Sequence, residues 1–259
     1  MIAICCGLTA GGVSAQQENP GAVAAAPPYI GEALPKAEAV IFAPYDEPED
    51  ISNIYWISSE AVREQTAPRI SRPPRATNDL DQRVRAYLDA HRGRWSGGFS
   101  DVDGQLLYDL ILENEYTRVV EIGTGTGHSA IWLAWALSKT GGKLTTIEIN
   151  ETRCREASAR FEEVGLSALI DVRCADALEV LPKLQGPFEF VFMDAPIVMG
   201  TDFFEAAAPK LVGGGRYVSH GIRGGEPWDY VHYLEGLTDF ETTFDTGGHF
   251  CTSRKTSEH

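Results

Sequence analysis

Acidic residues end several apolar stretches of the chain, where they could bind a polar ligand. Glu148 ends the stretch of residues 143–148, and Asp194 ends that of residues 188–194. Ligands of open α/β sheets bind at the carboxyl ends of the strands, so we expect both carboxylates at a shared rim. A carboxylate at the position of Glu148 can accept hydrogen bonds from both hydroxyls of a ribose. The alternative for Glu148 is a charge that stabilises the N-terminus of a following helix.

Glycines follow another apolar stretch that carries a carboxylate. Residues 118–129 read RVVEIGTGTGHS, with glycines at positions 123, 125 and 127 after Glu121, and apolar residues then recur at helical spacing. This pattern predicts a strand, a glycine turn and a helix. Glycine lets the backbone approach a ligand closely, and a helix N-terminus binds anions. A dinucleotide fingerprint needs a sixth-position glycine where this chain has His128, which disfavours an NAD(P)-dependent oxidoreductase.

The glycine stretch resembles the first motif of class I S-adenosylmethionine (SAM) methyltransferases. It is most similar to the E-x-G-T-G-x-G-x-S form in O-methyltransferases of the catechol and caffeoyl-CoA type. Residues 104–107 (GQLL) match the helix that precedes the first strand in that family, and residues 175–177 (ADA) match its G-D-A. The resemblance covers about residues 100–255. It implies SAM as the cofactor and methyl transfer to an oxygen of a small acceptor, for which aromatic compounds are the first candidates.

The resemblance also implies roles for individual residues. Glu148 would hold the ribose, and Asp176 with the backbone of Ala177 would meet the adenine, although Asp176 is also a suitable helix N-cap. Ser129 would bond the methionine carboxylate at the helix N-terminus. His128, which replaces a tyrosine common in the family, would line the cofactor pocket. The predicted cofactor-binding residues are Glu121, Gly123, Thr124, Gly125, Gly127, His128, Ser129, Glu148, Asp176, Ala177 and Asp194.

The metal chemistry of the family matches this chain poorly. The family pattern F-I-D-A-D-K reads FMDAPI at residues 192–197, so the lysine that serves as base in the relatives is missing. Asp194 matches a residue that binds a divalent cation there, but the Asp-Asn pair that supplies further ligands is Ser219 and His220. A hard cation prefers several carboxylate or amide oxygens. We therefore predict no metal ligands in this chain.

Asp194 and His220 are the predicted catalytic residues. A neutral histidine at the strand-end rim can take the proton of an acceptor hydroxyl near neutral pH. The alternative for His220 is a structural histidine at a strand end. The alternative for the whole protein is a SAM-binding protein of methyltransferase fold with lost or altered catalysis, which the missing lysine and Asp-Asn pair favour.

Strands and helices alternate regularly after residue 77. This alternation predicts one α/β domain over residues 77–259, with a Rossmann-like, doubly wound, mostly parallel sheet. Residues 240–245 and 250–254 are expected to form a C-terminal antiparallel hairpin. Gly213–Gly215 is expected to be a turn between a helix and the strand that starts at residue 216.

Composition excludes several classes of partner. The formal net charge of the 259 residues is −15, and such a surface repels the phosphate backbone of nucleic acids. No apolar run is long enough to span a bilayer as a mature segment. Homodimers are common among the relatives. The five cysteines form neither a C-x-x-C motif nor a zinc spacing, so we expect free, largely buried thiols.

The first 76 residues lie outside the resemblance. Residues 1–15 are apolar and end in small residues, like the core and cleavage site of a secretory signal, but no basic residue precedes Lys36. Export and a truncated or unrelated start stay open as alternatives, and the cytosolic supply of SAM favours the cytoplasm. Residues 16–76 are rich in Ala, Pro and Gly and are expected to form a flexible extension.

Overall fold

The computed structural model describes residues 74–91, 99–222, 228–244 and 250–256, together with two short strands nearer the N-terminus. These strands, β1 (Ala39–Ile41) and β2 (Ile54–Trp56), pair with each other in antiparallel orientation. They lie within the predicted extension, the rest of which falls outside the described residues up to residue 73. The signal-like segment 1–15 also lies outside them.

One seven-stranded sheet forms the centre of the domain. Its order is β5-β4-β3-β6-β7-β9-β8, and β9 runs antiparallel to both of its neighbours while the first five strands are parallel. This confirms the predicted mostly parallel sheet with a C-terminal antiparallel pair. The strands in sheet order are β5 (Ile170–Cys174), β4 (Lys143–Glu148), β3 (Arg118–Ile122), β6 (Phe188–Met193), β7 (Leu211–His220), β9 (Phe250–Lys255) and β8 (Phe240–Phe244).

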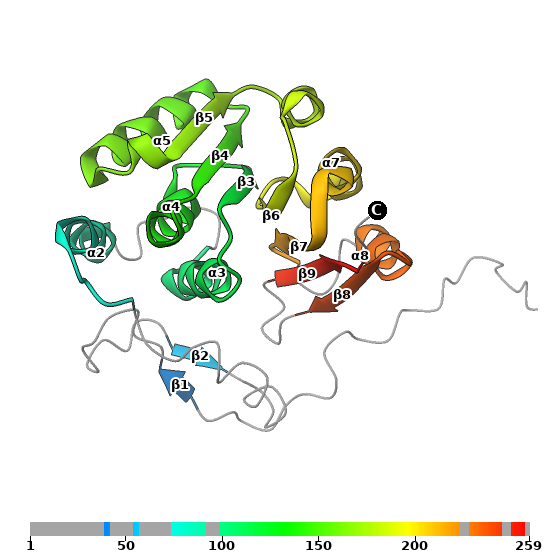
Figure 1. The fold of residues 1–259 in the computed structure, drawn as a ribbon, viewed down its shortest axis with the longest axis horizontal. Helices are drawn as coiled ribbons and strands as arrows, with labels where there is room; N and C mark the ends of the chain where they lie inside the picture. The colour runs from blue at the N-terminus through cyan, green and yellow to red at the C-terminus, as the bar shows by residue number, and fades with distance from the viewer. Residues whose placement is uncertain are drawn as a thin grey trace, which may run out of the picture.

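Helices cover both faces of the sheet (Figure 1). Four of them lie on one face and share its apolar core: α2 (Asp79–His91), α3 (Asp101–Glu113), α4 (His128–Thr140) and α5 (Glu151–Val164). The other face is covered by α6 (Ala177–Val180), α7 (Gly200–Ala207) and α8 (Trp228–Glu235). None of the helices in the described ranges is long and apolar enough to span a membrane.

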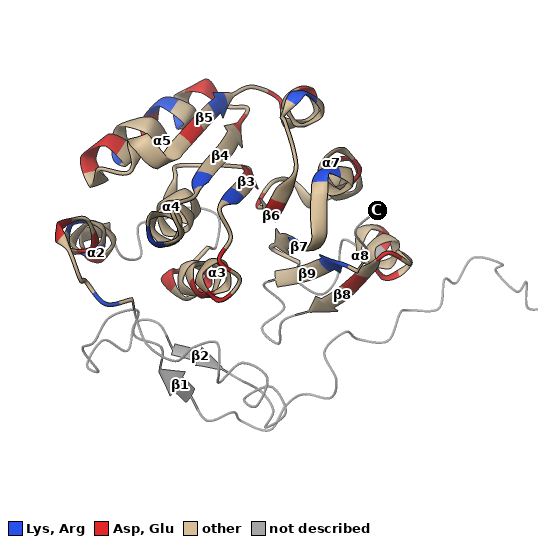
Figure 2. Ribbon diagram, viewed as in Figure 1, with Lys and Arg blue, Asp and Glu red and all other residues tan. Residues whose placement is uncertain are grey.

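Helix α4 lies deepest among these helices. All of its residues from His128 to Leu137 are buried, because it lies between the sheet and the neighbouring α2 and α3. An α-helix that is apolar on all sides needs such enclosure. Charged residues instead follow the outer surfaces of helices such as α5, where both signs are interspersed (Figure 2).

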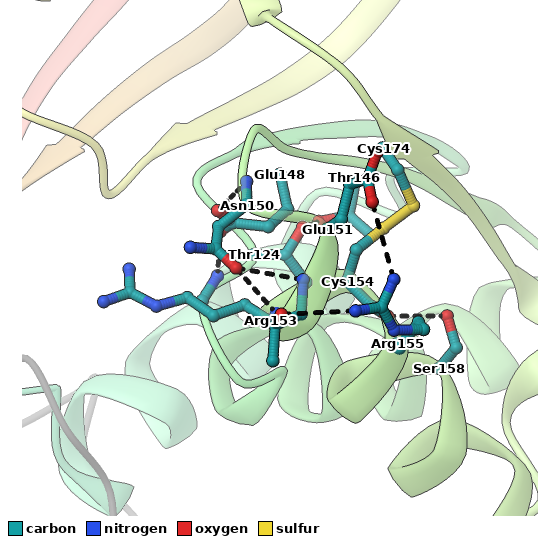
Figure 3. Close-up of a disulfide and its surroundings, with 12 residues drawn as sticks. Thr124, Thr146, Glu148, Asn150, Glu151, Arg153, Cys154, Arg155, Ser158 and Cys174 are labelled. Atoms are coloured by element: carbon teal, nitrogen blue, oxygen red, sulfur yellow. Dashed lines mark hydrogen bonds and ion pairs between the residues drawn. A yellow bond between two sulfur atoms is a disulfide. The ribbon is translucent and has the colours of Figure 1, made fainter.

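Two predictions about local structure are wrong. The glycines at 213–215 do not form a separate turn, because they lie inside β7, whose pairing with β6 shifts register between Phe188 and Phe190. Cys154 and Cys174 are not free thiols but form a disulfide (Figure 3). The crossover from β4 through α5 to β5 brings an early residue of the helix next to the last residue of the strand. Cys251, on β9, is buried and is not part of this disulfide.

Candidate functional site

The glycine turn between β3 and α4 packs tightly on one side and is open on the other. Gly123 has a φ of +94°, and a Cβ there would lie 2.2 Å from the carbonyl oxygen of Asp194. Gly125 has a φ of +54°, but a Cβ there would meet no atom within 4 Å. The first glycine thus joins the turn to the end of β6, and the second leaves space where a ligand can approach the backbone.

Glu148 is directed toward this turn. Its Oε2 accepts a hydrogen bond from the backbone N–H of Gly125 at 2.8 Å, and its Oε1 accepts one from Asn150 at 2.8 Å. The carboxylate is buried, yet each of its oxygens can accept a further hydrogen bond. Figure 3 shows Glu148 and Asn150 at the end of β4, beside the disulfide. The structure therefore brings Glu148 and Gly125 of the glycine turn together.

Glu121 lies beneath the turn and is completely buried. It accepts hydrogen bonds from the hydroxyls of Ser129 and Thr146, both at 2.5 Å, and Thr146 in turn bonds the hydroxyl of Thr124. Burial raises the pKa of Glu121 to about 7, against the lowering effect of these hydrogen bonds. The Ser129 hydroxyl therefore donates its hydrogen bond to Glu121 and not to the carboxylate of a bound ligand. What Ser129 offers to an anion is its backbone N–H in the first turn of α4.

Asp176 lies at the carboxyl end of the sheet, after β5. It is the N-cap of α6, and its Oδ1 accepts a hydrogen bond from the backbone of Leu178 at 2.9 Å. The capping role considered from sequence is therefore present. Ala177 begins the helix, so its backbone lies at the same edge of the sheet as Glu148.

His220 lies between two carboxylates. Its Nδ1 is 3.0 Å from Oδ1 of Asp194, and its Nε2 is 3.8 Å from Oδ2 of Asp103. Burial alone would lower the pKa of His220, but the hydrogen bond to Asp194 and the negative charges of Asp194 and Asp103 outweigh it and raise the pKa to about 9. The ring is thus an imidazolium at neutral pH, which differs from the neutral histidine expected from sequence.

Exposure separates the two predicted catalytic residues. The His220 side chain is 3% exposed, whereas that of Asp194 is 28% exposed. The rings of Phe99, Phe192 and Phe250 surround the imidazole. Asp194 is therefore the member of the pair that an acceptor molecule can reach.

His128 makes a similar pair with the start of α3. Its Nε2 is 3.1 Å from Oδ1 of Asp101, and its ring meets the edge of Phe99. Burial lowers the pKa of His128, which the nearby Asp101 only partly offsets. These contacts direct the ring toward α3. His128 would therefore contribute to a cofactor pocket only from the buried side of the glycine turn.

The strand-end site agrees with comparisons to known proteins. Residues 120–222 match a family described as a methyltransferase domain. An O-methyltransferase from Streptomyces achromogenes, solved with SAM, has a TM-score of 0.56 and 26% identity, with 71% of this chain and 92% of that chain covered. The chain therefore has the fold of this SAM-bound O-methyltransferase, and its residues 120–222 are similar to a methyltransferase domain.

Two further relatives extend the comparison. A catechol O-methyltransferase from Niastella koreensis is 34% identical over 108 residues, which cover 40% of this chain and 48% of that enzyme. The chain thus spans about half the length of the curated relatives it matches. An O-methyltransferase from Bacillus cereus, solved with S-adenosylhomocysteine, shares the fold with a TM-score of 0.57 at 22% identity, over 76% of this chain and 97% of that one.

Among the described residues, the side chains around Asp194 do not form a suitable cage for a magnesium ion. Asp194 is engaged with His220, and the hydroxyl of Ser219 is bonded to that of Tyr230 at 2.8 Å. Within the described ranges, no three His, Cys, Asp or Glu side chains converge on a point that could hold a metal. The donor set therefore does not fit the divalent cation of the catechol-type relatives.

Sequence reasoning missed the acidic start of α3. Asp101 pairs with His128 and Asp103 with His220, and Phe99 contacts both imidazole rings. A local signal was present, because Ser100 followed by Asp103 forms a capping box at this helix. That signal predicts a helix start, but it does not reveal a partner more than a hundred residues away.

Proposed function

We propose that the protein transfers the methyl group of SAM to a hydroxyl oxygen of a small acceptor. The observation that carries the proposal is the position of Glu148, whose carboxylate meets the open glycine turn at Gly125. A buried acid next to bare backbone matches the needs of an adenosyl group, since the acid accepts from ribose hydroxyls and the backbone allows close approach. The similarity to O-methyltransferases supports the same conclusion.

The residues of the turn fit the cofactor. Glu148 would accept the ribose hydroxyls, and the first backbone N–H groups of α4, including that of Ser129, would bind the carboxylate of the methionine part. Asp176 and the backbone of Ala177 lie beside Glu148 and would meet the adenine. SAM supplies a methyl group on a positively charged sulfur, which the acidic side chains of this rim favour electrostatically.

Asp194 would act on the acceptor. Its exposed side can accept a hydrogen bond from the hydroxyl and receive its proton as the oxygen attacks, while His220 holds its Oδ1. Methyl transfer is an in-line displacement, so the orientation of the acceptor matters as much as its basicity. The acidic side chain facing the acceptor favours a neutral hydroxyl compound over an anionic one. We propose that this reaction needs no divalent metal.

Calorimetry with SAM and S-adenosylhomocysteine tests cofactor binding. Glu148→Gln should weaken binding of both about 10- to 100-fold, the cost of losing hydrogen bonds to a charged group. Glu151→Gln is the matched control: Glu151 is an exposed carboxylate three residues away that forms an ion pair with Arg155, and its replacement should leave the affinity unchanged. Absence of binding to the unmodified protein would refute the proposal.

A second assay tests catalysis. Phenols, catechols and other small hydroxyl compounds would be screened with methyl-labelled SAM, with magnesium or with a chelator. We expect transfer that is insensitive to the chelator. Binding of SAM without transfer to any acceptor would favour a protein that retains the cofactor site but not the reaction, and transfer that requires magnesium would contradict the metal-free mechanism.

A further inference from the structure

Three elements of the fold contribute to one chain of charged groups. Asp194 follows β6, His220 ends β7, and Asp103 lies in the first turn of α3. The imidazole connects the two carboxylates, with Nδ1 toward Asp194 and Nε2 toward Asp103. Asp103 is 2% exposed and lies inside the protein, whereas Asp194, at the other end of this series of charged groups, reaches the surface.

We propose that Asp103 is a positioning residue for methyl transfer, which holds His220 so that His220 holds the Asp194 carboxylate toward the acceptor. The proposal rests on the function proposed above for Asp194. It assigns to α3, which lies outside the matched residues 120–222, a part in the reaction. Asp103 touches neither acceptor nor cofactor in this arrangement and acts only through the imidazole.

The position of Asp103 is fixed by its own hydrogen bonds. Its Oδ2 accepts from both the backbone N–H and the hydroxyl of Ser100, each at 2.7 Å, and this capping box fixes the start of α3. The helix is also held close to α4, because a Cβ on Gly104 would lie 2.3 Å from the ring of Trp132. The carboxylate therefore presents a rigid negative group to His220.

The described residues around the imidazole are acidic on two sides and aromatic on others. In the part of the chain that the structure describes, Asp103 on α3 and Asp194 after β6 are the charged groups that face it. The aromatic rings of Phe99, Phe192 and Phe250 fill the remaining sides. A cation in such an apolar enclosure needs both carboxylates. Without Asp103 the ring would lose its charge at a lower pH, and its hydrogen bond to Asp194 would weaken.

The test is Asp103→Asn, which keeps an oxygen to accept from Ser100. We expect kcat to fall about 10- to 100-fold, the cost of a misplaced reacting group, with the acceptor KM and the affinity for S-adenosylhomocysteine changed less than about twofold. Nitrogen-15 NMR of labelled histidines should show the His220 titration moved to lower pH. Asp103→Glu, which keeps the charge, should restore part of that titration.

Two controls isolate the effect. Asp101→Asn removes the buried carboxylate that pairs with His128, and it should leave the titration of His220 in place. Asp109→Asn changes a carboxyl on the same helix outside the site, and it should leave kcat unchanged. If Asp103→Asn alters neither kcat nor the His220 titration, the proposal is wrong.

The unmodified protein gives a test that does not depend on a variant folding. Both nitrogens of His220 should carry protons at pH 7 in its NMR spectrum, and a neutral ring would overturn the proposal. Failure of the unmodified protein to bind S-adenosylhomocysteine would instead refute the proposed function, so the two failures are distinguishable. If Asp103→Asn does not fold, the same kcat comparison is made with Asp103→Ser, which also removes the charge, and a rate equal to that of the unmodified protein contradicts a positioning role.

Discussion

A hydrogen bond of 2.8 Å joins the carboxylate of Glu148 to the backbone N–H of Gly125, although the two residues lie on different strand-to-helix connections. It links the turn after β3 to the end of β4. The two halves of the proposed cofactor site are thereby held together before any ligand binds. Such preorganisation lowers the entropy that binding must overcome.

The two glycines of the turn should respond differently to a methyl group. Gly125→Ala should fold with a loss of about 1 kcal/mol, the strain of a positive φ, because its Cβ meets open space. It should nevertheless lose affinity for S-adenosylhomocysteine, since that space is where the ligand lies. Gly123→Ala should lose far more stability, because its Cβ would meet the Asp194 carbonyl. Urea unfolding and calorimetry measure both effects, and a Gly125→Ala variant with unchanged affinity would place the ligand elsewhere.

The charge of His220 should make stability depend on pH. Its pKa is about 9 in the fold and 6.5 without the surrounding carboxylates, so the fold binds its proton more tightly. The resulting stabilisation is complete below pH 6.5 and is lost as the pH rises through 9. The difference in unfolding free energy between the unmodified protein and His220→Gln should therefore shrink between pH 7 and 10. A difference that stays constant over this range would show that the ring is neutral.

Glu121 should also make the fold less stable as the pH rises, but over a lower pH range. Burial raises its pKa from 4.5 to about 7, so the fold favours the protonated acid. As Glu121 ionises, the unfolding free energy therefore falls progressively between pH 4.5 and 7. Glu121→Gln, which cannot ionise, should gain stability relative to the unmodified protein over this interval and hold the gain above it. Urea titrations at pH 4.5, 6 and 8 measure the trend, and a relative gain that shrank with pH would contradict it.

The disulfide should stabilise the fold. Cys154 and Cys174 are 20 residues apart, and closing a loop of this length contributes about 3 kcal/mol to the unfolding free energy. A double Cys154→Ser, Cys174→Ser variant should lose about this amount, and a reducing agent should give the unmodified protein the same loss. Mass spectrometry of the unreduced protein should find the two cysteines joined. A reducing agent that lowers the stability of the double variant equally would point to a different cause.

The sequence predicted the elements whose pattern is local. Strand β3, the glycine turn and α4 were recognisable because periodicity changes abruptly there, and Glu148 and Asp194 because each follows an apolar strand. The glycines of β7 were misread because glycine is usually a sign of a turn, whereas here they lie inside the strand, where its pairing with β6 changes register.

Long-range partners could not be predicted in this way. Cys154 and Cys174 belong to a helix and a strand, and only the packing of α5 against β5 brings their sulfurs together. Likewise, the charge of His220 depends on Asp103, which comes from α3 on the other side of the glycine turn in sequence. The spacing of residues in the sequence therefore does not reveal that two carboxylates surround the imidazole of His220.

The enclosure of α4 determines how the domain can change. A helix without an outward side cannot serve as a docking surface, nor can it accept polar substitutions without disturbing two layers at once. Variation in partners or in acceptor preference must therefore arise elsewhere, on the loops at the rim of the sheet. The proposed cofactor site adjoins this enclosed helix and should tolerate few substitutions. The loops around it can change with less disturbance of the core.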